Sequence, residues 1–144
     1  MTSRSNAPQA VVVDTNILFS ALLAPDTPYA RTLLTDTNYI YYICETVIVE
    51  VFEHRDKLLK ISKLSLDDLL VLYHLLLRQL TLFKESLIKA EHKQRAMDLC
   101  ARVDPEDAIH VALAFELDAL LWTGDKKLRD HLREQGFDRF FVIR

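Results

Sequence analysis

The stretch Val103–Asp125, VDPEDAIHVALAFELDALLWTGD, decides the fold that this sequence predicts. Asp104 is typical of a helix cap, and proline follows it at a first helical position, ahead of a continuous apolar helix. Residues 119–122 (ALLW) have the length and composition of a short buried strand. Gly124 then permits a tight turn before Asp125. The stretch therefore predicts a helix and a strand with carboxylates at their ends.

The rest of the chain repeats this alternation of strands and helices. Residues 10–13 (AVVV) are typical of a strand buried on both faces, and Asp14 follows them directly. Strands that alternate with helices predict an α/β fold with a parallel sheet. The valines of segment 45–54 also fit a strand, although a helix is preferred there. The expected helices are 16–24, 28–36, 45–54, 55–63, 65–80, 91–102, 104–117 and 126–135, and the expected strands are 10–13, 39–43, 82–88, 119–122 and 140–143.

Helix 65–80 is apolar on nearly every side. Ser65 and Asp68 predict a capping box at its start. A surface helix needs only one apolar face, so two interpretations remain open. The helix is buried on several sides within its own domain, or part of it contacts a second subunit or a partner protein.

Length and composition predict one soluble domain. The chain has 144 residues, is 50% apolar and has a net charge of −3, so it lacks an overall basic field for nucleic acid. Residues 1–9 are polar and are expected to be a flexible N-terminus, followed by a single domain over residues 10–144. The two glycines exclude a glycine-rich phosphate loop.

The cysteines and the N-terminus indicate a cytoplasmic protein. Cys44 and Cys100 have no metal-site spacing and are expected to be buried thiols of a reducing compartment. The first 25 residues resemble a signal peptide, but Asp14 and Asn16 interrupt the apolar centre, which argues against export. No apolar run is long enough to span a membrane.

Four acids are expected to converge at one edge of the sheet. In an open parallel sheet, function gathers beyond the carboxyl ends of the strands, where the strand order reverses. Asp14 and Asp125 both follow such ends, Asp107 lies in a first helical turn, and Glu50 lies on the helix after the second strand. Such acids would repel one another unless a cation neutralised them, and hard oxygen ligands favour Mg²⁺ or Mn²⁺. A bound water could then attack a phosphodiester.

Each acid also has a purely structural interpretation. Asp14, Asp104 and Asp125 could simply cap helices, and Asp107 could complete a capping box. Glu50 could pair with His54 one turn later. His110 shares a helix face with Asp107, where a core or rim histidine is more common than a ligand.

Three segments together resemble the PIN-domain nuclease family. They are VVVDTNILFSALL, ETVIVEVFEH and DPEDAIHVALAFELDALLWTGDKKL, and they cover nearly the whole chain in the family's order. The D-T-N and W-T-G-D-K-K-L parts are the most specific. The resemblance implies a three-layer α/β/α fold around a parallel sheet of about five strands. It also implies metal-dependent cleavage of single-stranded RNA, and bacterial members of the family include toxins of toxin–antitoxin pairs.

The resemblance also implies roles for individual residues. Asp14, Glu50, Asp107 and Asp125 would form the acidic catalytic and metal-binding site, and Asp104 matches a further metal-binding acid found in part of the family. Glu45 and Glu53 are alternatives if the helix phase differs from the expected one. Polar support would come from Asn16, which would orient Asp14, and from Thr123, which would orient the turn before Asp125.

Basic residues follow Asp125 directly. Lys126, Lys127 and Arg129 could hold an RNA backbone beside the metal site, since phosphate contacts supply affinity without reading sequence. The alternative is an ordinary solvated helix face.

The sequence thus predicts a Mg²⁺- or Mn²⁺-dependent endoribonuclease, the toxin of a toxin–antitoxin pair. Its expected partners are a single-stranded or structured RNA, an antitoxin protein and a second copy of the chain, without a membrane. One alternative is a phosphotransferase or phosphatase with Asp14 as nucleophile, although Asn16 stands where that pattern wants an acid. Another is an inactive PIN-like module that binds RNA or protein.

Overall fold

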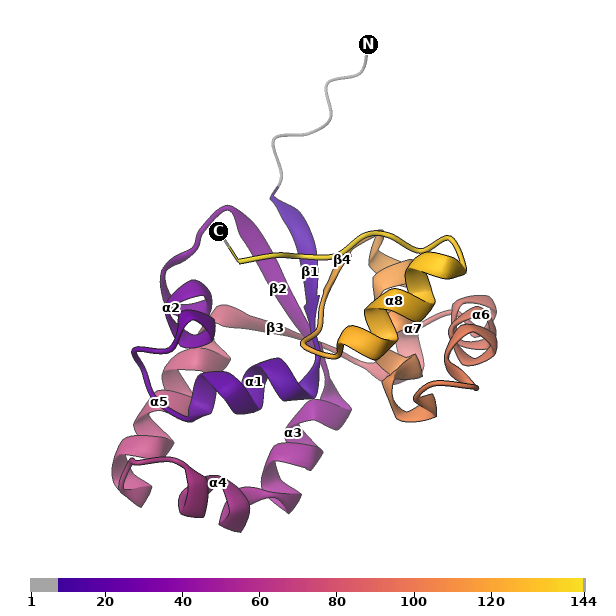
Figure 1. Ribbon diagram of the computed structural model, residues 1–144. Coiled ribbons are helices and arrows are strands. Elements are labelled where there is room, and N and C mark those ends of the chain that lie inside the picture. Colours follow the sequence, from indigo (N-terminus) through magenta and orange to yellow (C-terminus); the bar gives the residue numbers. More distant parts are fainter. Residues whose placement is uncertain (1–7, 144) are drawn as a thin grey trace.

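A parallel sheet forms the centre of the protein, and the computed structural model describes residues 8–143. The strands are β1 (Gln9–Val13), β2 (Tyr39–Cys44), β3 (Leu80–Phe83) and β4 (Leu120–Trp122). Within the described residues they form one sheet in the order β3-β2-β1-β4, with every pair parallel (Figure 1). Val11 of β1 pairs with Tyr41 on one side and with Leu120 on the other. The arrangement confirms the predicted α/β class, with slightly fewer strands than five.

Helices cover both faces of this sheet and make three layers (Figure 1). The α-helices are α1 (Thr15–Leu22), α2 (Pro28–Thr35), α3 (Glu45–Glu53), α4 (Arg55–Ile61), α5 (Leu66–Gln79), α6 (Ala90–Cys100), α7 (Ala108–Leu117) and α8 (Lys126–Glu134). Short 3-10 helices span Glu85–Leu87 and Pro105–Asp107. Val11 and Val13 face a core formed with α1 to α5, whereas Val12 faces a second core formed with α6, α7 and α8. Burial on both faces explains the uninterrupted β-branched run of β1.

The valine-rich segment after β2 is helical. In α3, Val47 and Val51 are buried while Val49 is 54% exposed. A strand would have placed all three on one face, whereas a helix separates Val49 from the other two. The third strand begins at Leu80 rather than Leu82, because Leu80 already pairs with Tyr41.

The predicted last strand, residues 140–143, is reduced to one parallel bridge between Leu121 and Phe140. The Leu121 amide donates to the Arg139 carbonyl at 2.9 Å, and the Phe141 amide donates to the Leu121 carbonyl at 2.9 Å. Phe141 then turns inward against Trp122, with ring centroids 4.7 Å apart. Aromatic packing therefore takes over where a longer ladder was expected.

The two ends of the domain qualify two further expectations. Of the predicted flexible segment 1–9, residues 1–7 lie outside the described residues, and Gln9 is already the first residue of β1. No helix among residues 8–143 combines the length and the apolar character needed to cross a membrane.

Candidate functional site

The strand order reverses between β1 and β4, and acidic residues follow both strands. Asp14 comes directly after β1, and its amide donates to the Trp122 carbonyl at the end of β4 at 3.2 Å. Asp125 follows three residues after Trp122. Parallel sheets place their sites in the crevice beyond such a reversal.

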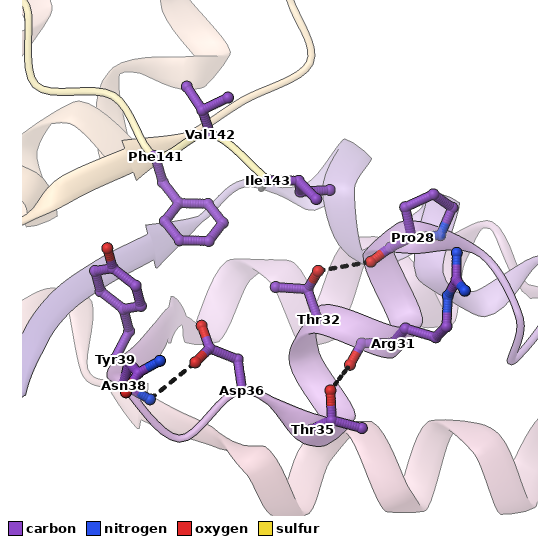
Figure 2. A pocket seen from close by; sticks show the side chains of 10 residues that line it. All are labelled: Pro28, Arg31, Thr32, Thr35, Asp36, Asn38, Tyr39, Phe141, Val142 and Ile143. Atoms are coloured by element: carbon purple, nitrogen blue, oxygen red, sulfur yellow. Dashed lines mark hydrogen bonds between the residues drawn. The ribbon is translucent and has the colours of Figure 1, made fainter.

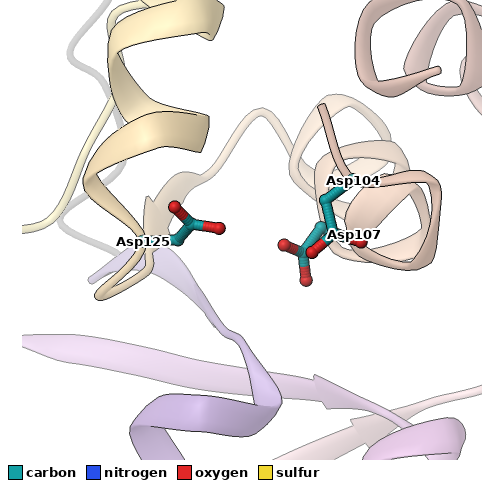
Figure 3. Close-up of side chains that lie close together, drawn as sticks. All are labelled: Asp104, Asp107 and Asp125. Atoms are coloured by element: carbon teal, nitrogen blue, oxygen red, sulfur yellow. The ribbon is translucent and has the colours of Figure 1, made fainter. Parts of the chain in front are cut away.

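Three acids meet beside this reversal. Asp104, Asp107 and Asp125 each offer a carboxylate oxygen, and these oxygens all lie within 4.8 Å of one another. Figure 3 shows Asp125 facing the other two across a gap. We call these residues the three-acid cluster. Asp104 also accepts from the Glu106 amide at 3.1 Å, and Asp125 accepts from the Leu128 amide at 3.1 Å, so both cap helices as well.

Asp14 lies near this cluster, since its charge acts on Asp107 and the Asp125 charge acts on it, and it is 2% exposed. Its Oδ1 accepts from the Ile17 amide at 3.0 Å and caps α1, whereas its Oδ2 is buried without a hydrogen-bond partner among residues 8–143. Burial raises the pKa of Asp14 and the nearby Asp125 charge adds to the rise, while Thr123 lies close enough to lower the pKa in part. That contact is not a regular hydrogen bond, because the Oδ2 atom meets no donor at proper geometry. Asp14 therefore presents one buried oxygen that lacks a regular hydrogen bond and that Thr123 compensates only in part.

The pKa of Asp107 lies far above its ordinary value. Burial raises its pKa to about 7, and the charges of Asp104, Asp14 and Asp125 contribute to the rise. Near neutral pH Asp107 is thus partly protonated, and a bound cation would favour its ionised form.

Glu50 lies outside the three-acid cluster. The Thr15 hydroxyl donates to its Oε1 at 3.2 Å, and burial raises the pKa of Glu50, with the charges of Glu106 and Glu53 adding to the rise. The structure therefore brings Asp104, Asp107 and Asp125 together with Asp14 near them, and places Glu50 on α3 outside this group.

The donor set suits a hard divalent cation. Carboxylate oxygens are the ligands that Mg²⁺ and Mn²⁺ prefer, and the buried Oδ2 of Asp14 and the raised pKa of Asp107 both fit a site that a cation would stabilise. Asp104, Asp107, Asp125 and Asp14 are the residues that would hold such an ion.

The turn before Asp125 is fixed by two contacts. The Asp125 amide donates to the Thr123 hydroxyl at 3.1 Å, and the Arg129 guanidinium donates to the Thr123 carbonyl at 2.9 Å. Asn16 differs, because its side chain is exposed, and only its backbone acts on Asp14, where it lowers the pKa less than Thr123 and Ile17 do. Arg129 thus holds the protein's own backbone, a role that the sequence did not suggest.

The two lysines after Asp125 are both exposed, but their surroundings differ. Lys126 pairs with Asp130 one turn later, at 2.9 Å. Lys127 lines a shallow depression that also contains Arg102 and His131.

Thr15 and His110 were not expected to act together. Their side chains lie 3.5 Å apart, between Oγ1 and Nε2, next to Glu50. His110 is buried in the core, as its structural interpretation proposed, but at a point that reaches the site. In the sequence, a role for Thr15 near the site is indicated only by its position directly after Asp14.

A cavity of about 740 Å³ lies at the other end of the strands, away from the three-acid cluster. Tyr39 and Phe141 point into it, and Thr32 and Asp36 lie across from them (Figure 2). It opens beside the start of β2, whereas the acids follow the strand ends. The cavity is therefore separate from the acidic site.

We expect the metal-free protein to lose stability as the pH rises from 3.8, the ordinary pKa of Asp107, to about 7, its folded value. Across this window the folded state binds more protons than the unfolded chain, so the free energy of unfolding falls with pH. Asp107→Asn removes this titration and should raise the melting temperature at pH 8 relative to wild type, but not at pH 4. Thermal unfolding in EDTA measures this difference, and a difference independent of pH would contradict it.

The chain is similar to known proteins in both sequence and fold. A family model described as PIN domain matches residues 12–138. The fold is similar to a chain in the crystal structure of VapBC2 from Rickettsia felis bound to a DNA fragment from their promoter. The TM-score is 0.65 at 18% identity, and the match covers 84% of this chain and 92% of that chain. No curated protein matches the sequence.

Proposed function

Because this chain belongs to the PIN-domain family, we propose that it is a metal-dependent endoribonuclease that cleaves single-stranded RNA. The observation that carries the proposal is the convergence of Asp104, Asp107 and Asp125 beside the strand-order reversal. Within this proposal Asp14, Glu50, Asp107 and Asp125 are the catalytic acids, and Asp104 is a further ligand.

The residues divide the work as follows. A bound Mg²⁺ or Mn²⁺ ion would supply Lewis-acid activation of a phosphodiester and of an attacking water. Asp107 would hold the cation in its ionised form, so cation binding should strengthen toward pH 8. Asp14 uses Oδ1 to hold α1 and keeps Oδ2 for the site. Thr123 and Arg129 keep Asp125 at the crevice.

The test is cleavage of end-labelled RNA by the purified protein. We expect cuts in single-stranded RNA with Mg²⁺ or Mn²⁺, none in EDTA, and weaker cutting of duplex RNA. No cleavage with either metal, and no Mn²⁺-induced rise in melting temperature, would favour an inactive binding module, because a ligand that binds only the folded state must stabilise it.

Lys127 is the exposed cation that we propose for RNA backbone contact. Lys127→Ala should weaken RNA binding at 50 mM salt and lower the slope of log affinity against log salt by about 1. Lys126→Ala should have a smaller effect because its ammonium group already pairs with Asp130. Binding of labelled RNA in EDTA at several salt concentrations measures both. Arg31→Ala, beside the cavity at the other end of the strands, is the control, and an equal loss in all three variants would contradict the assignment.

We also propose that the protein is the toxin of a toxin–antitoxin pair in the cytoplasm. The VapBC2 assembly from Rickettsia felis supports a protein partner for a chain of this fold. Cys44 and Cys100 are buried free thiols, as a reducing compartment favours. A small neighbouring reading frame whose product copurifies with this chain and stops RNA cleavage would support the pairing, and growth unaffected by expression of active enzyme would oppose it.

A second copy of the chain is the partner that we propose for α5. Leu69, Leu72 and Leu76 face the core, whereas Leu70 and Leu75 are exposed and flank the outward face of the helix on its two sides. In an antiparallel pair of α5 helices related by a two-fold axis, Leu70 would contact the partner's Leu75. The same symmetry would place Asp67 of one subunit opposite the partner's Arg78.

A charge-reversal experiment tests this pairing. Asp67→Arg should shift the protein toward monomer because it sets two bases against each other, and adding Arg78→Asp should restore the dimer. Sedimentation velocity measures the two states. A wild-type monomer at 100 µM, or a double variant no better than the single one, would contradict the proposed interface.

A further inference from the structure

Thr15 joins two side chains that come from distant parts of the chain. Its Oγ1 donates to Glu50 Oε1 at 3.2 Å and lies 3.5 Å from His110 Nε2. Thr15 begins α1, Glu50 lies on α3, and His110 lies on α7 within the core. A threonine hydroxyl has one proton, so while it donates to Glu50 it can only accept from His110.

The surroundings of His110 favour one tautomer of its ring. Burial lowers the pKa of His110 to about 4, so the imidazole is neutral at pH 7 and carries one N–H. Its Nδ1 is buried and has no hydrogen-bond partner among residues 8–143. A proton there would be a buried donor without an acceptor, which is costly, whereas a proton on Nε2 has the Thr15 oxygen as acceptor.

We propose that His110 and Thr15 are positioning residues that hold Glu50. His110 donates from Nε2 to Thr15 Oγ1, and this contact directs the hydroxyl proton toward Glu50 Oε1. The role rests on the proposed function, in which Glu50 is a site acid. It explains why two polar side chains are buried between α1 and α7, where apolar residues would pack at no polar cost.

Glu50 depends on the hydrogen bond from Thr15 because it lies outside the three-acid cluster. Within the described part of the protein, its carboxylate accepts one side-chain hydrogen bond, from Thr15. Contacts that orient a metal-site residue typically change metal affinity or activity by about 10-fold to 100-fold when they are removed. The Thr15 hydroxyl should therefore affect the site although it binds neither metal nor RNA.

The first test needs neither metal nor RNA. Nitrogen-15 NMR of the wild-type protein in EDTA at pH 7 should show the His110 proton on Nε2. Thr15→Val keeps the side-chain shape but removes the acceptor, so the Nε2 proton should exchange faster with water. A wild-type ring protonated on Nδ1 would overturn the proposal.

The second test measures how loss of the Thr15 hydroxyl affects RNA cleavage and Mn²⁺ binding. Thr15→Val should lower kcat by about 10-fold to 100-fold with KM for RNA nearly unchanged, and should raise the Mn²⁺ concentration needed for half of the melting-temperature rise by about 10-fold. Thr15→Ser retains the hydroxyl and should restore both. Thr46→Val is the matched control, since the buried Thr46 hydroxyl lacks a hydrogen-bond partner within residues 8–143.

The two proposals fail in different ways. If wild type does not cut RNA but Thr15→Val still weakens the Mn²⁺ response, the positioning role stands and the nuclease assignment falls. If wild type cuts RNA and Thr15→Val matches it in kcat and in Mn²⁺ response, the positioning role falls.

Discussion

Asp14→Asn should reduce RNA cleavage by about 1,000-fold, the upper range for loss of one group that stabilises charge in a transition state. Asp14 is 2% exposed and offers the site a buried Oδ2. Asparagine retains an oxygen that can accept from the Ile17 amide, so the cap of α1 survives. It also removes a buried acid whose pKa is raised by burial, so the metal-free variant should be no less stable than wild type at pH 8.

This prediction is checked by kcat/KM with Mn²⁺ and by the Mn²⁺-induced rise in melting temperature, which the variant should lose. Asp26→Asn is the control, because Asp26 is an exposed acid in the turn between α1 and α2. An Asp14→Asn protein that cuts RNA at the wild-type rate with metal present would disprove the mechanism. A variant that unfolds below the wild-type temperature would instead assign Asp14 a structural role.

The sequence predicted the sheet because Val11, Val12 and Val13 of β1 are buried on both faces. Residues 10–13 have no polar interruption, and β1 lies in the middle of the sheet between β2 and β4. The central position of β1 agrees with this burial, since helices cover both faces of a parallel sheet. Asp14 and Asp125 could be placed together for the same reason, because the ends of adjacent parallel strands meet at one edge.

Contacts between helices could not be predicted in the same way. Whether Glu50 reaches the acids depends on the rotation of α3 about its own axis, and one residue shifts that rotation by about 100°. The link through Thr15 to His110 joins residues 95 apart in the chain. The sequence predicted that Arg129 could hold an RNA backbone, and it gave no indication that the guanidinium also donates to the Thr123 carbonyl.

The C-terminal segment shows how packing replaces strand pairing. Phe141 is 8% exposed, and its ring contacts Trp122, Tyr39 and Tyr41 at centroid distances of 4.7, 5.1 and 5.8 Å. One bridge between Leu121 and Phe140 is the backbone pairing described for this segment. The aromatic cluster, rather than a hydrogen-bonded ladder, therefore holds the C-terminal segment to the sheet.

Phe141→Ala should lower the free energy of unfolding by about 3 kcal/mol, because it leaves a cavity among three aromatic rings. For a domain of this size the melting temperature should fall by about 10 °C. Val142→Ala is the matched control, since Val142 is 69% exposed and its truncation should cost less than about 0.5 kcal/mol. Trp122 packs on Phe141, and its carbonyl accepts from the Asp14 amide, so cleavage by Phe141→Ala should fail at a lower temperature than in wild type. Equal unfolding of the two variants in urea would mean that the segment is held by its backbone after all.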